Sequence, residues 1–302
     1  MLVNFRRTRS GLEFSEIGLG CMNLPENYQL ASEIMDSAIN QGINYFDTAD
    51  LYNKGKNEEL IGKFLKEHHK RNDVLIGSKV GNEFNFEDDD VKWNPSRNHI
   101  LNSVKESLRR LKIDYLDLYM LHGGTMEDDK DETIDAFNTL KNDGLIRAYG
   151  ISSIRPNVIS YYLKHSDIDV IMMQFNMLDN RPEMLTDTIA EHDVKILARG
   201  PVMKGLLTDH YSEVVDKKFS KGILDYSKDE LTQILSKAAM DSPLTESTMS
   251  YLLNHPVASI VCGASSPDQL QTNLAHYEQI KNSAANSTRD YFKNIDYQDH
   301  LS

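Results

Sequence analysis

The sequence has 302 residues and a formal net charge of −13, so it lacks the overall basic charge with which proteins bind nucleic acid or anionic membranes. Hydrophobic residues make up 40% of the chain and charged residues 26%, which excludes a fibrous or a disordered protein. The length alone fits one large α/β domain or two small ones.

Short apolar runs alternate with longer stretches of helical periodicity along the chain, which is the pattern of β-strand and α-helix units around a parallel sheet. Eight such units suit a (β/α)8 TIM barrel of about 250 residues plus insertions, whereas a doubly wound sheet normally has fewer strands. The predicted strands are residues 17–21, 44–47, 74–79, 115–121, 148–151, 170–174, 195–199 and 260–262.

The stretches between these strands have the periodicity of amphipathic helices. In one of them, Leu101, Val104, Leu108 and Leu111 recur at three- and four-residue steps, which predicts a buried face. The opposite face of the same helix is expected to carry Lys105, Glu106 and Arg110. No linker rich in proline, glycine or serine interrupts the series, so residues 1–302 are predicted to form a single domain.

Two stretches that leave the carboxyl ends of predicted strands are interpreted as long loops. Residues 81–98 contain an acidic run at 87–90 and the only tryptophan, Trp93, and residues 208–227 follow the seventh strand. Barrel active sites lie at this face, so such loops are candidate lids or substrate walls. Trp93 is predicted to line a substrate pocket, although it could instead anchor its loop and leave the acidic run as a solvated surface.

Four chemically distinct side chains lie at or just beyond the ends of three predicted strands. Asp47, Lys79 and His122 follow apolar runs, and Tyr52 comes five residues after Asp47 in the adjoining loop. A carboxylate, a phenol, an amine and an imidazole at the functional face of a barrel indicate a catalytic centre with a proton relay. Taken singly, each could be an ordinary ion-paired or core residue; the full set favours catalysis.

Around these residues the chain resembles the aldo-keto reductase superfamily, from about Ser10 to Tyr277. Residues 8–20 look like the family's opening hairpin and first strand, and residues 44–52 look like its Asp/Tyr signature. Lys79 and His122 complete the tetrad. Further matching segments, in the family's order, are residues 150–153, 174–178, 199–207 and 263–273.

The resemblance implies an oxidoreductase that reduces an aldehyde or ketone to an alcohol by hydride transfer from a nicotinamide cofactor. Tyr52 would be the general acid, although a free phenol, with a pKa of about 10, is a weak acid at neutral pH. Lys79 would favour the phenolate, and Asp47 would keep Lys79 charged in a desolvated site. His122 would donate or orient a hydrogen bond at the substrate oxygen, so that Tyr52, His122 and Trp93 are the predicted substrate contacts.

The cofactor is expected to lie extended across the barrel mouth without the glycine fingerprint of a dinucleotide-binding fold, which this sequence lacks. By matching positions, Ser152 and Gln174 would bind the carboxamide, residues 200–206 the diphosphate and residues 263–273 the adenosine end, where backbone donors suit phosphate. The full set of predicted cofactor contacts is Gly20, Met22, Asp47, Ser152, Gln174, Arg199, Gly200, Pro201, Val202, Lys204, Gly205, Gly263, Ser265, Gln269 and Asn273.

Three positions depart from the family pattern. Ser153 stands where asparagine is common, and Arg199 stands where many members place an aromatic ring on the nicotinamide; a planar guanidinium can also stack. Residues 263–269 carry no cation, although relatives that prefer the 2′-phosphorylated cofactor usually have one there. Ser265 and Ser266 could donate hydrogen bonds to a phosphate, but more weakly than a cation. NADP(H) is favoured on family frequency, and NAD(H) remains an alternative.

The two cysteines and the histidines give no sign of a metal or of a disulfide framework. Cys21 and Cys262 fall at the ends of the first and eighth predicted strands, which become neighbours when a barrel closes. They could approach each other, but two reduced core thiols are the favoured interpretation. No apolar stretch reaches about 18 residues and residues 1–10 lack a signal core, so the expected location is the cytoplasm.

Two other functions compete with the reductase. A nicotinamide-sensing or partner-binding barrel would bind the cofactor with little turnover, and a lyase or aldolase would use Lys79 as a Schiff-base nucleophile. The aldolase leaves Asp47 and Tyr52 without clear roles. The physiological substrate would depend on loops around Trp93, Phe84, Asn180 and Tyr211, and the oligomeric state cannot be predicted.

Overall fold

A computed structural model of the protein describes residues 3–85, 90–281 and 288–301. Within these residues eight parallel strands pair side by side until the last strand closes on the first, which confirms the predicted (β/α)8 barrel. In their order around the barrel the strands are β3 (Ile17–Gly20), β4 (Tyr45–Asp47), β5 (Leu75–Val80), β8 (Leu116–Leu121), β9 (Ile146–Ser152), β10 (Val170–Gln174), β11 (Lys195–Arg199) and β12 (Val257–Gly263).

The predicted strands agree with the observed ones to within a residue or two in most cases. The bounds of β10 and β11 are the same, whereas β12 begins at Val257 rather than at the predicted residue 260. Closure of the barrel pairs Cys262 with Leu19 and Gly263 with Gly20. The first and last strands therefore end at the same mouth of the barrel.

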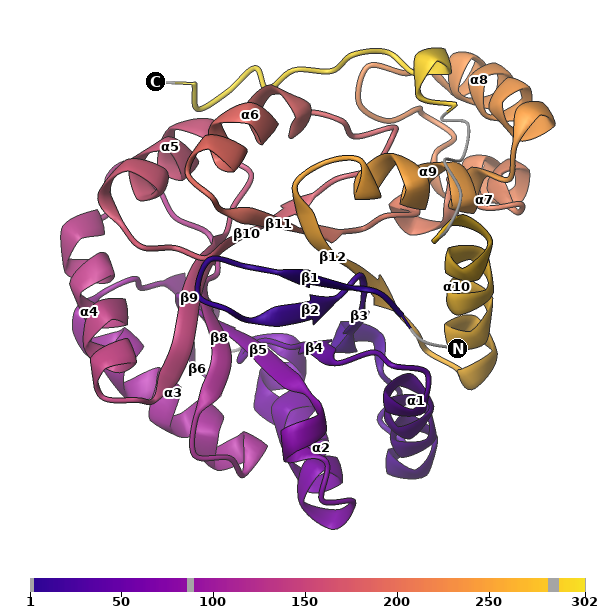
Figure 1. Ribbon diagram of the computed structural model, residues 1–302. Helices are drawn as coiled ribbons and strands as arrows, with labels where there is room; N and C mark the ends of the chain where they lie inside the picture. The colour runs from indigo at the N-terminus through magenta and orange to yellow at the C-terminus, as the bar shows by residue number, and fades with distance from the viewer. Residues whose placement is uncertain (1–2, 86–89, 282–287, 302) are drawn as a thin grey trace.

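Helices surround the barrel on its outside, as Figure 1 shows. Ser96 begins one of them by accepting a hydrogen bond from the backbone of His99. The helices are α1 (Tyr28–Asn40), α2 (Lys56–Glu67), α3 (Arg97–Leu111), α4 (Lys130–Asn142), α5 (Pro156–His165), α6 (Glu183–Glu191), α7 (Tyr211–Lys218), α8 (Lys228–Asp241), α9 (Leu244–Leu253) and α10 (Pro267–Ile280).

Helix α3 buries the apolar face that the sequence predicts, with one exception on its polar side. Val104, Leu108 and Leu111 are buried, but Arg110 is not a freely solvated residue. Its guanidinium pairs with the fully buried carboxylate of Glu58 on α2 at 2.7 Å. The ion pair links two neighbouring helices, which is why a charged residue occurs at this partly buried position.

An antiparallel hairpin of β1 (Phe5–Arg7) and β2 (Glu13–Ser15) lies across the other mouth of the barrel, as the family resemblance implies (Figure 1). Leu12 and Phe14 of the hairpin are buried and belong to the apolar cluster inside the barrel. The Phe14 ring packs edge-on against Tyr45, with 4.9 Å between ring centroids. The hairpin thus closes the amino-terminal mouth and leaves the carboxyl-terminal mouth open for a site.

Neither predicted long loop is irregular throughout. Within residues 81–98, β6 (Asn82–Asn85) and β7 (Asp90–Trp93) form an antiparallel hairpin; residues 87–89 of the acidic run lie outside the described residues. Within residues 208–227, α7 contributes two turns of helix. The hairpin places Trp93 at the end of β7, back near the barrel mouth, because Asn82 pairs with Trp93.

Residues 288–301 cross the outside of the molecule past α6 and end near α5, as Figure 1 shows. Asn180, expected near the substrate, is instead 1% exposed and holds this segment in place. Its amide nitrogen donates to the carbonyl of Lys293 at 2.8 Å, and its oxygen accepts from the backbone of Ile295 at 2.9 Å. The Asn180 side chain therefore fixes the carboxyl-terminal segment 288–301 against the barrel.

Both cysteines are free and buried, so the structure shows no disulfide between Cys21 and Cys262 and supports two reduced core thiols. Among the described residues no three histidine, cysteine or carboxylate side chains gather as a metal site. None of the described helices is long and apolar enough to cross a membrane.

Candidate active site

The barrel mouth contains a fully buried lysine bound to a nearly buried carboxylate. Lys79, on β5, has no exposed surface, and its Nζ lies 2.9 and 2.8 Å from the two carboxylate oxygens of Asp47 at the end of β4. The same nitrogen donates to the carbonyl of Thr48 at 2.7 Å. Burial lowers the pKa of Lys79, but the charges of and hydrogen bonds to Asp47 and Tyr52 together outweigh burial, so the pKa lies above its ordinary value and the ammonium persists.

Tyr52 completes the coordination of this ammonium. It follows β4 in a tight turn in which Asn53 and Lys54 have positive φ angles, and the turn directs the phenol back over the barrel mouth. Lys79 Nζ donates to the Tyr52 hydroxyl at 3.4 Å and lies 5.0 Å from the centre of its ring. The structure thus brings Asp47, Lys79 and Tyr52 into one continuous polar chain.

The acidity of Tyr52 differs from the sequence-based expectation. Burial raises the pKa of the phenol, and the positive charge of Lys79, which lowers the pKa as predicted, offsets only part of that effect. The net pKa therefore lies above its ordinary value in this structure. Tyr52 is consequently a protonated hydrogen-bond donor at neutral pH.

His122 lies at the same mouth, one residue after the end of β8. Its ring meets the Tyr52 ring edge-on with 6.2 Å between centroids, and its backbone N–H donates to Val80. Burial, together with the nearby positive charges of Lys79 and Arg199, lowers the pKa of His122 to about 3. The imidazole is therefore neutral at physiological pH, and its Nδ1 is buried without a hydrogen-bond partner among the described residues.

A cavity of about 450 Å³ opens beside His122. Trp93 forms one wall, its indole N–H donates to Asp128 at 2.9 Å, and its ring covers Gly81 and Gly123 so closely that a Cβ on Gly81 would lie 2.5 Å away. The described residues that line the cavity are Trp93, His122, Gly123, Gly124, Thr125, Ser152, Ser153, Ile154, Arg155 and Arg199.

Comparison with known proteins places the chain in a family. The model of the Aldo/keto reductase family matches residues 16–288, which is most of the chain. The chain belongs to the aldo/keto reductase family. Its members are nicotinamide-dependent oxidoreductases that act on carbonyl groups.

Several known proteins are similar to this aldo-keto reductase over most of its length. The uncharacterized oxidoreductase YqkF of Bacillus subtilis (strain 168) is 45% identical over 94% of this chain and 96% of its own. The holo form of the aldo-keto reductase AKR11C1 from Bacillus halodurans superposes with a TM-score of 0.92 at 44% identity, covering 99% of this chain and 100% of its own. The NADH-specific methylglyoxal reductase of Escherichia coli (strain K12) is 28% identical over 89% of each chain.

The positions that the family resemblance assigns to the nicotinamide, Ser152 and Gln174 for its carboxamide and Arg199 for its ring, lie on three successive strands of this reductase. Ser152 ends β9, Gln174 ends β10 and Arg199 ends β11, and Ser152 and Arg199 both line the cavity. Arg199 donates to the Gln174 Oε1 at 3.3 Å. Ser153, which replaces the family's usual asparagine, is 6% exposed, and its hydroxyl accepts from the backbone of Arg155 rather than projecting freely.

The segment assigned to the diphosphate follows β11 as an irregular turn. Gly200 and Gly205 have φ angles of +64° and +101°, a region in which side chains other than glycine are strained, and Lys204 is also left-handed at +55°. The Pro201 carbonyl accepts from Thr248 on α9, which anchors the turn from outside the barrel. Val202 is partly buried, and the Lys204 side chain is exposed.

The segment assigned to the adenosine end begins where β12 ends and continues into α10. Gln269 Oε1 accepts from both the backbone and the hydroxyl of Ser265, at 2.9 and 3.1 Å, and Asn273 donates to the carbonyl of Gly263. On the adjoining strand, Gly20 ends β3 and Met22 is 60% exposed just beyond it. The predicted cofactor positions therefore form a continuous rim from β9 through β12 to β3.

Sequence reasoning missed two residues that organise this rim and the tetrad. Tyr45, two residues before Asp47 on the same face of β4, donates from its buried hydroxyl to the Asp47 carboxylate at 3.0 Å. Asp179 accepts a hydrogen bond from the Gln174 amide at 2.9 Å. The alternation of β4 could have revealed Tyr45, because residues two apart share a strand face. No periodic signal marks Asp179, which lies in an irregular segment.

Proposed function

We propose that this protein reduces a small aldehyde or ketone to the alcohol, with Tyr52 as the general acid. The observation that carries the proposal is the ammonium of Lys79, which is fully buried and contacts both the Asp47 carboxylate and the Tyr52 hydroxyl. The Tyr52 ring in turn meets the ring of His122, which lines the cavity. Burying an ammonium costs several kcal/mol of desolvation free energy unless an opposite charge or hydrogen bonds compensate it. A catalytic role explains why the lysine also reaches a phenol.

Proton delivery follows from this arrangement. As negative charge develops on the substrate oxygen, Tyr52 releases its hydroxyl proton to that oxygen, and Lys79, 3.4 Å away, stabilises the phenolate that remains. Asp47 balances the lysine charge and fixes its position through two hydrogen bonds. The buried Tyr45 hydroxyl holds Asp47 from the interior of the barrel.

His122 is proposed to contact the same oxygen as a neutral hydrogen-bond donor. Its depressed pKa excludes a cationic imidazolium at physiological pH, so it orients the carbonyl and leaves proton transfer to Tyr52. Two donors that converge on one oxygen stabilise developing charge in a desolvated site. Trp93, as an aromatic wall of the cavity, is proposed to pack against the body of the substrate.

The residues at the rim fit a nicotinamide, which supplies a hydride when it is bound in its reduced form. A carboxamide needs one hydrogen-bond donor and one acceptor, and Ser152 and Gln174 supply a hydroxyl and an amide oxygen at neighbouring strand ends. Arg199 can stack on the ring. The positive φ angles at Gly200, Lys204 and Gly205 mark a turn of the kind that can bind the diphosphate through backbone groups.

NADPH is the cofactor we propose, with NADH as the alternative. Ser266 begins α10, and its hydroxyl, with the amino end of a 14-residue helix, can donate to a 2′-phosphate, whereas the Ser265 hydroxyl donates to Gln269 in this structure. Residues 263–269 contribute no cation, so the preference for NADPH is expected to be modest. Initial rates at matched NADPH and NADH concentrations test this, and an NADH preference would select the alternative.

The decisive experiment measures nicotinamide oxidation with a panel of aromatic aldehydes and dicarbonyls for the native protein and for Tyr52→Phe. Turnover is expected to fall by at least about a hundredfold in the variant, because the proton donor is removed. Tyr28→Phe is the matched control, since that phenol lies on α1 and bonds the exposed Glu67. Tight cofactor binding without turnover of any carbonyl would instead favour a nicotinamide sensor.

A further inference from the structure

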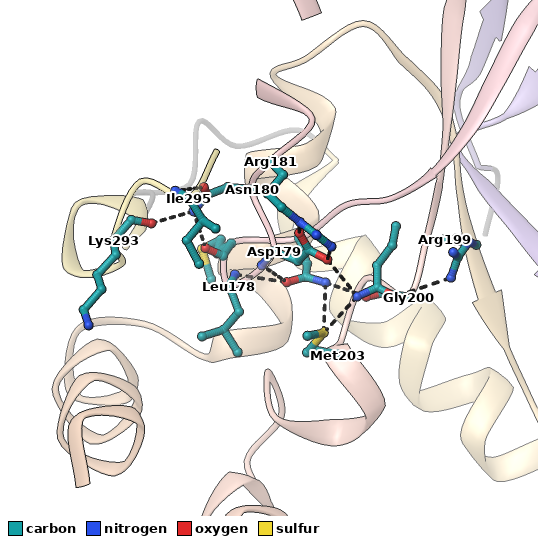
Figure 2. A network of polar contacts seen from close by, with 12 residues as sticks. Leu178, Asp179, Asn180, Arg181, Arg199, Gly200, Met203, Lys293 and Ile295 are labelled. Atoms are coloured by element: carbon teal, nitrogen blue, oxygen red, sulfur yellow. Dashed lines mark hydrogen bonds and ion pairs between the residues drawn. The ribbon is translucent and has the colours of Figure 1, made fainter. Parts of the chain in front are cut away.

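Asp179 is a buried carboxylate whose position is fixed by the turn that precedes it. It is 0% exposed, and the side-chain oxygen of Asn176 accepts hydrogen bonds from the backbone of Leu178 at 3.0 Å and of Asp179 at 2.8 Å. Asn176 in turn donates to the carbonyl of Gly200 at 2.9 Å. The turn and the segment after β11 are therefore tied together, as Figure 2 shows.

The charge of Asp179 is matched by Arg181 in a two-point contact. Arg181 Nε and Nη2 lie 2.7 and 2.8 Å from the two carboxylate oxygens. A bidentate pair of this kind offsets much of the cost of burying a carboxylate. One oxygen of Asp179 also accepts a hydrogen bond from the Gln174 amide at 2.9 Å. The Asp179–Arg181 ion pair therefore contacts a residue of the predicted cofactor rim.

This contact determines which way the Gln174 amide points. An ionised carboxylate only accepts hydrogen bonds, so the NH2 group of Gln174 must face Asp179 and its Oε1 must face the other way. There Oε1 accepts from Arg199 at 3.3 Å, and Arg199 lines the cavity beside His122. Met203 Sδ, 3.4 Å from the Gln174 nitrogen, covers the same NH2 group (Figure 2).

We propose that Asp179 is a positioning residue for the nicotinamide carboxamide, acting through Gln174. By holding the Gln174 NH2 group, Asp179 presents Oε1 as an acceptor for the carboxamide NH2 and prevents the amide from turning over. If the Gln174 amide turned over, its NH2 group would face the NH2 group of the nicotinamide carboxamide. This repulsive contact would favour a nicotinamide bound with its ring rotated by half a turn. The inference rests on the proposed function, because it assumes that Gln174 contacts the nicotinamide.

Asp179→Asn tests the proposal, because asparagine can donate as well as accept and no longer dictates the amide direction. Calorimetric titration is expected to show about a tenfold weaker affinity for the intact dinucleotide, which corresponds to the loss of one well-oriented hydrogen bond to the carboxamide. Affinity for ADP-ribose, which lacks the nicotinamide, is expected to stay within about twofold. Deuterium transfer from a cofactor labelled on one face is expected to lose part of its stereospecificity.

A purely structural role would give different results. If Asp179 only held the segment after β11, the dinucleotide and ADP-ribose would lose affinity equally, which would overturn the proposal. Unchanged affinity and unchanged stereospecificity would overturn it as well. In a Gln174→Met background the Asp179→Asn change is expected to add no further loss of dinucleotide affinity, because the partner through which it acts is gone.

Two further variants guard against misfolding. Asp169→Asn removes another buried carboxylate, one that binds Ser10 at the opposite mouth of the barrel, and it should leave the affinity for the dinucleotide unchanged. If Asp179→Asn does not fold, Asp179→Glu keeps a charge for Arg181 but displaces the carboxylate, and the same nicotinamide-specific loss is expected. A native protein that binds no nicotinamide would refute the proposed function itself, before any variant is compared.

Discussion

Lys79 is the residue on which the stability and the chemistry of the barrel mouth both depend. With the lysine removed, the Tyr45 hydroxyl would be the one side-chain donor left to the almost fully buried Asp47 within the described part of the chain. An uncompensated buried charge of this kind usually costs about 3–5 kcal/mol.

Lys79→Met is therefore expected to lower the free energy of unfolding by about 3–5 kcal/mol and to reduce turnover by at least about a hundredfold. Urea unfolding and initial rates measure the two effects. Lys63→Met is the matched control, because Lys63 pairs with Glu67 and lies over the Tyr28 ring on an exposed surface, and it should contribute less than about 1 kcal/mol. Equal effects of the two substitutions would contradict the burial argument.

The pH dependence of reduction follows from Tyr52 and His122. Burial raises the pKa of Tyr52, so the phenol keeps its proton as the pH rises, and His122 stays neutral until the pH falls to about 3. We expect kcat/KM for reduction to be nearly flat from about pH 5 to 9. An inflection near the ordinary histidine pKa, absent in His122→Asn, would show that the imidazole titrates during turnover.

The sequence alone predicted that Asp47, Tyr52, Lys79 and His122 lie together, because three of them come at the ends of apolar runs and Tyr52 lies in the loop after the first of these runs. It did not predict that burial would outweigh Lys79 in setting the pKa of Tyr52, since that balance depends on the desolvation of the phenol in the folded site. Asp179 was also missed, because its partners Gln174 and Arg181 meet it only through an irregular turn.

The β1–β2 hairpin is an element whose contribution to stability can be separated residue by residue. Phe14 is fully buried against Tyr45 in the interior of the barrel, whereas Phe5, on the partner strand, is 51% exposed. Apolar burial, and not the hairpin conformation itself, should therefore decide the effect of truncating either ring.

Phe14→Ala is expected to lower the free energy of unfolding by about 3–5 kcal/mol, through lost burial and the cavity left behind. Phe5→Ala is expected to change it by no more than about 0.5 kcal/mol. Chemical denaturation of the two variants and of the native protein measures these differences in the free energy of unfolding. A small effect at Phe14 would mean that the hairpin covers the mouth of the barrel without stabilising it.

The barrel strands could be predicted from sequence, but the β6–β7 hairpin could not. Barrel strands are continuous apolar runs because both faces are covered, whereas β6 and β7 carry asparagine, glutamate, aspartate and lysine, most of which are depleted in strands. Their pairing brings Trp93 back to the mouth, where its ring packs on Gly81 and Gly123. Only the three-dimensional arrangement supplies those contacts.

The reactivity of the two cysteine thiols can be used to measure unfolding of the whole barrel. Cys21 and Cys262 are buried near the carboxyl ends of the neighbouring strands β3 and β12. Burial raises the pKa of both thiols, that of Cys262 to about 12, so the reactive thiolate is scarce at neutral pH.

We expect neither thiol to react with an aromatic disulfide reagent in the native protein and both to react in denaturant, whether or not reductant was added beforehand. The labelling rate in native buffer should follow the rate of global unfolding, because the barrel must open before either sulfur is exposed. Rapid labelling of one cysteine without loss of tertiary structure would show that a local opening is sufficient.

The closed barrel also separates two tasks along the chain. The residues proposed for proton transfer end with His122, just after β8, whereas most of those proposed for the cofactor begin with Ser152 at the end of β9. A chimera that joins the first part of this chain to the second part of a relative with a different dinucleotide preference should keep its acid chemistry and inherit the relative's reductant. Substrate activation and reductant choice would then be exchangeable modules of one uninterrupted barrel.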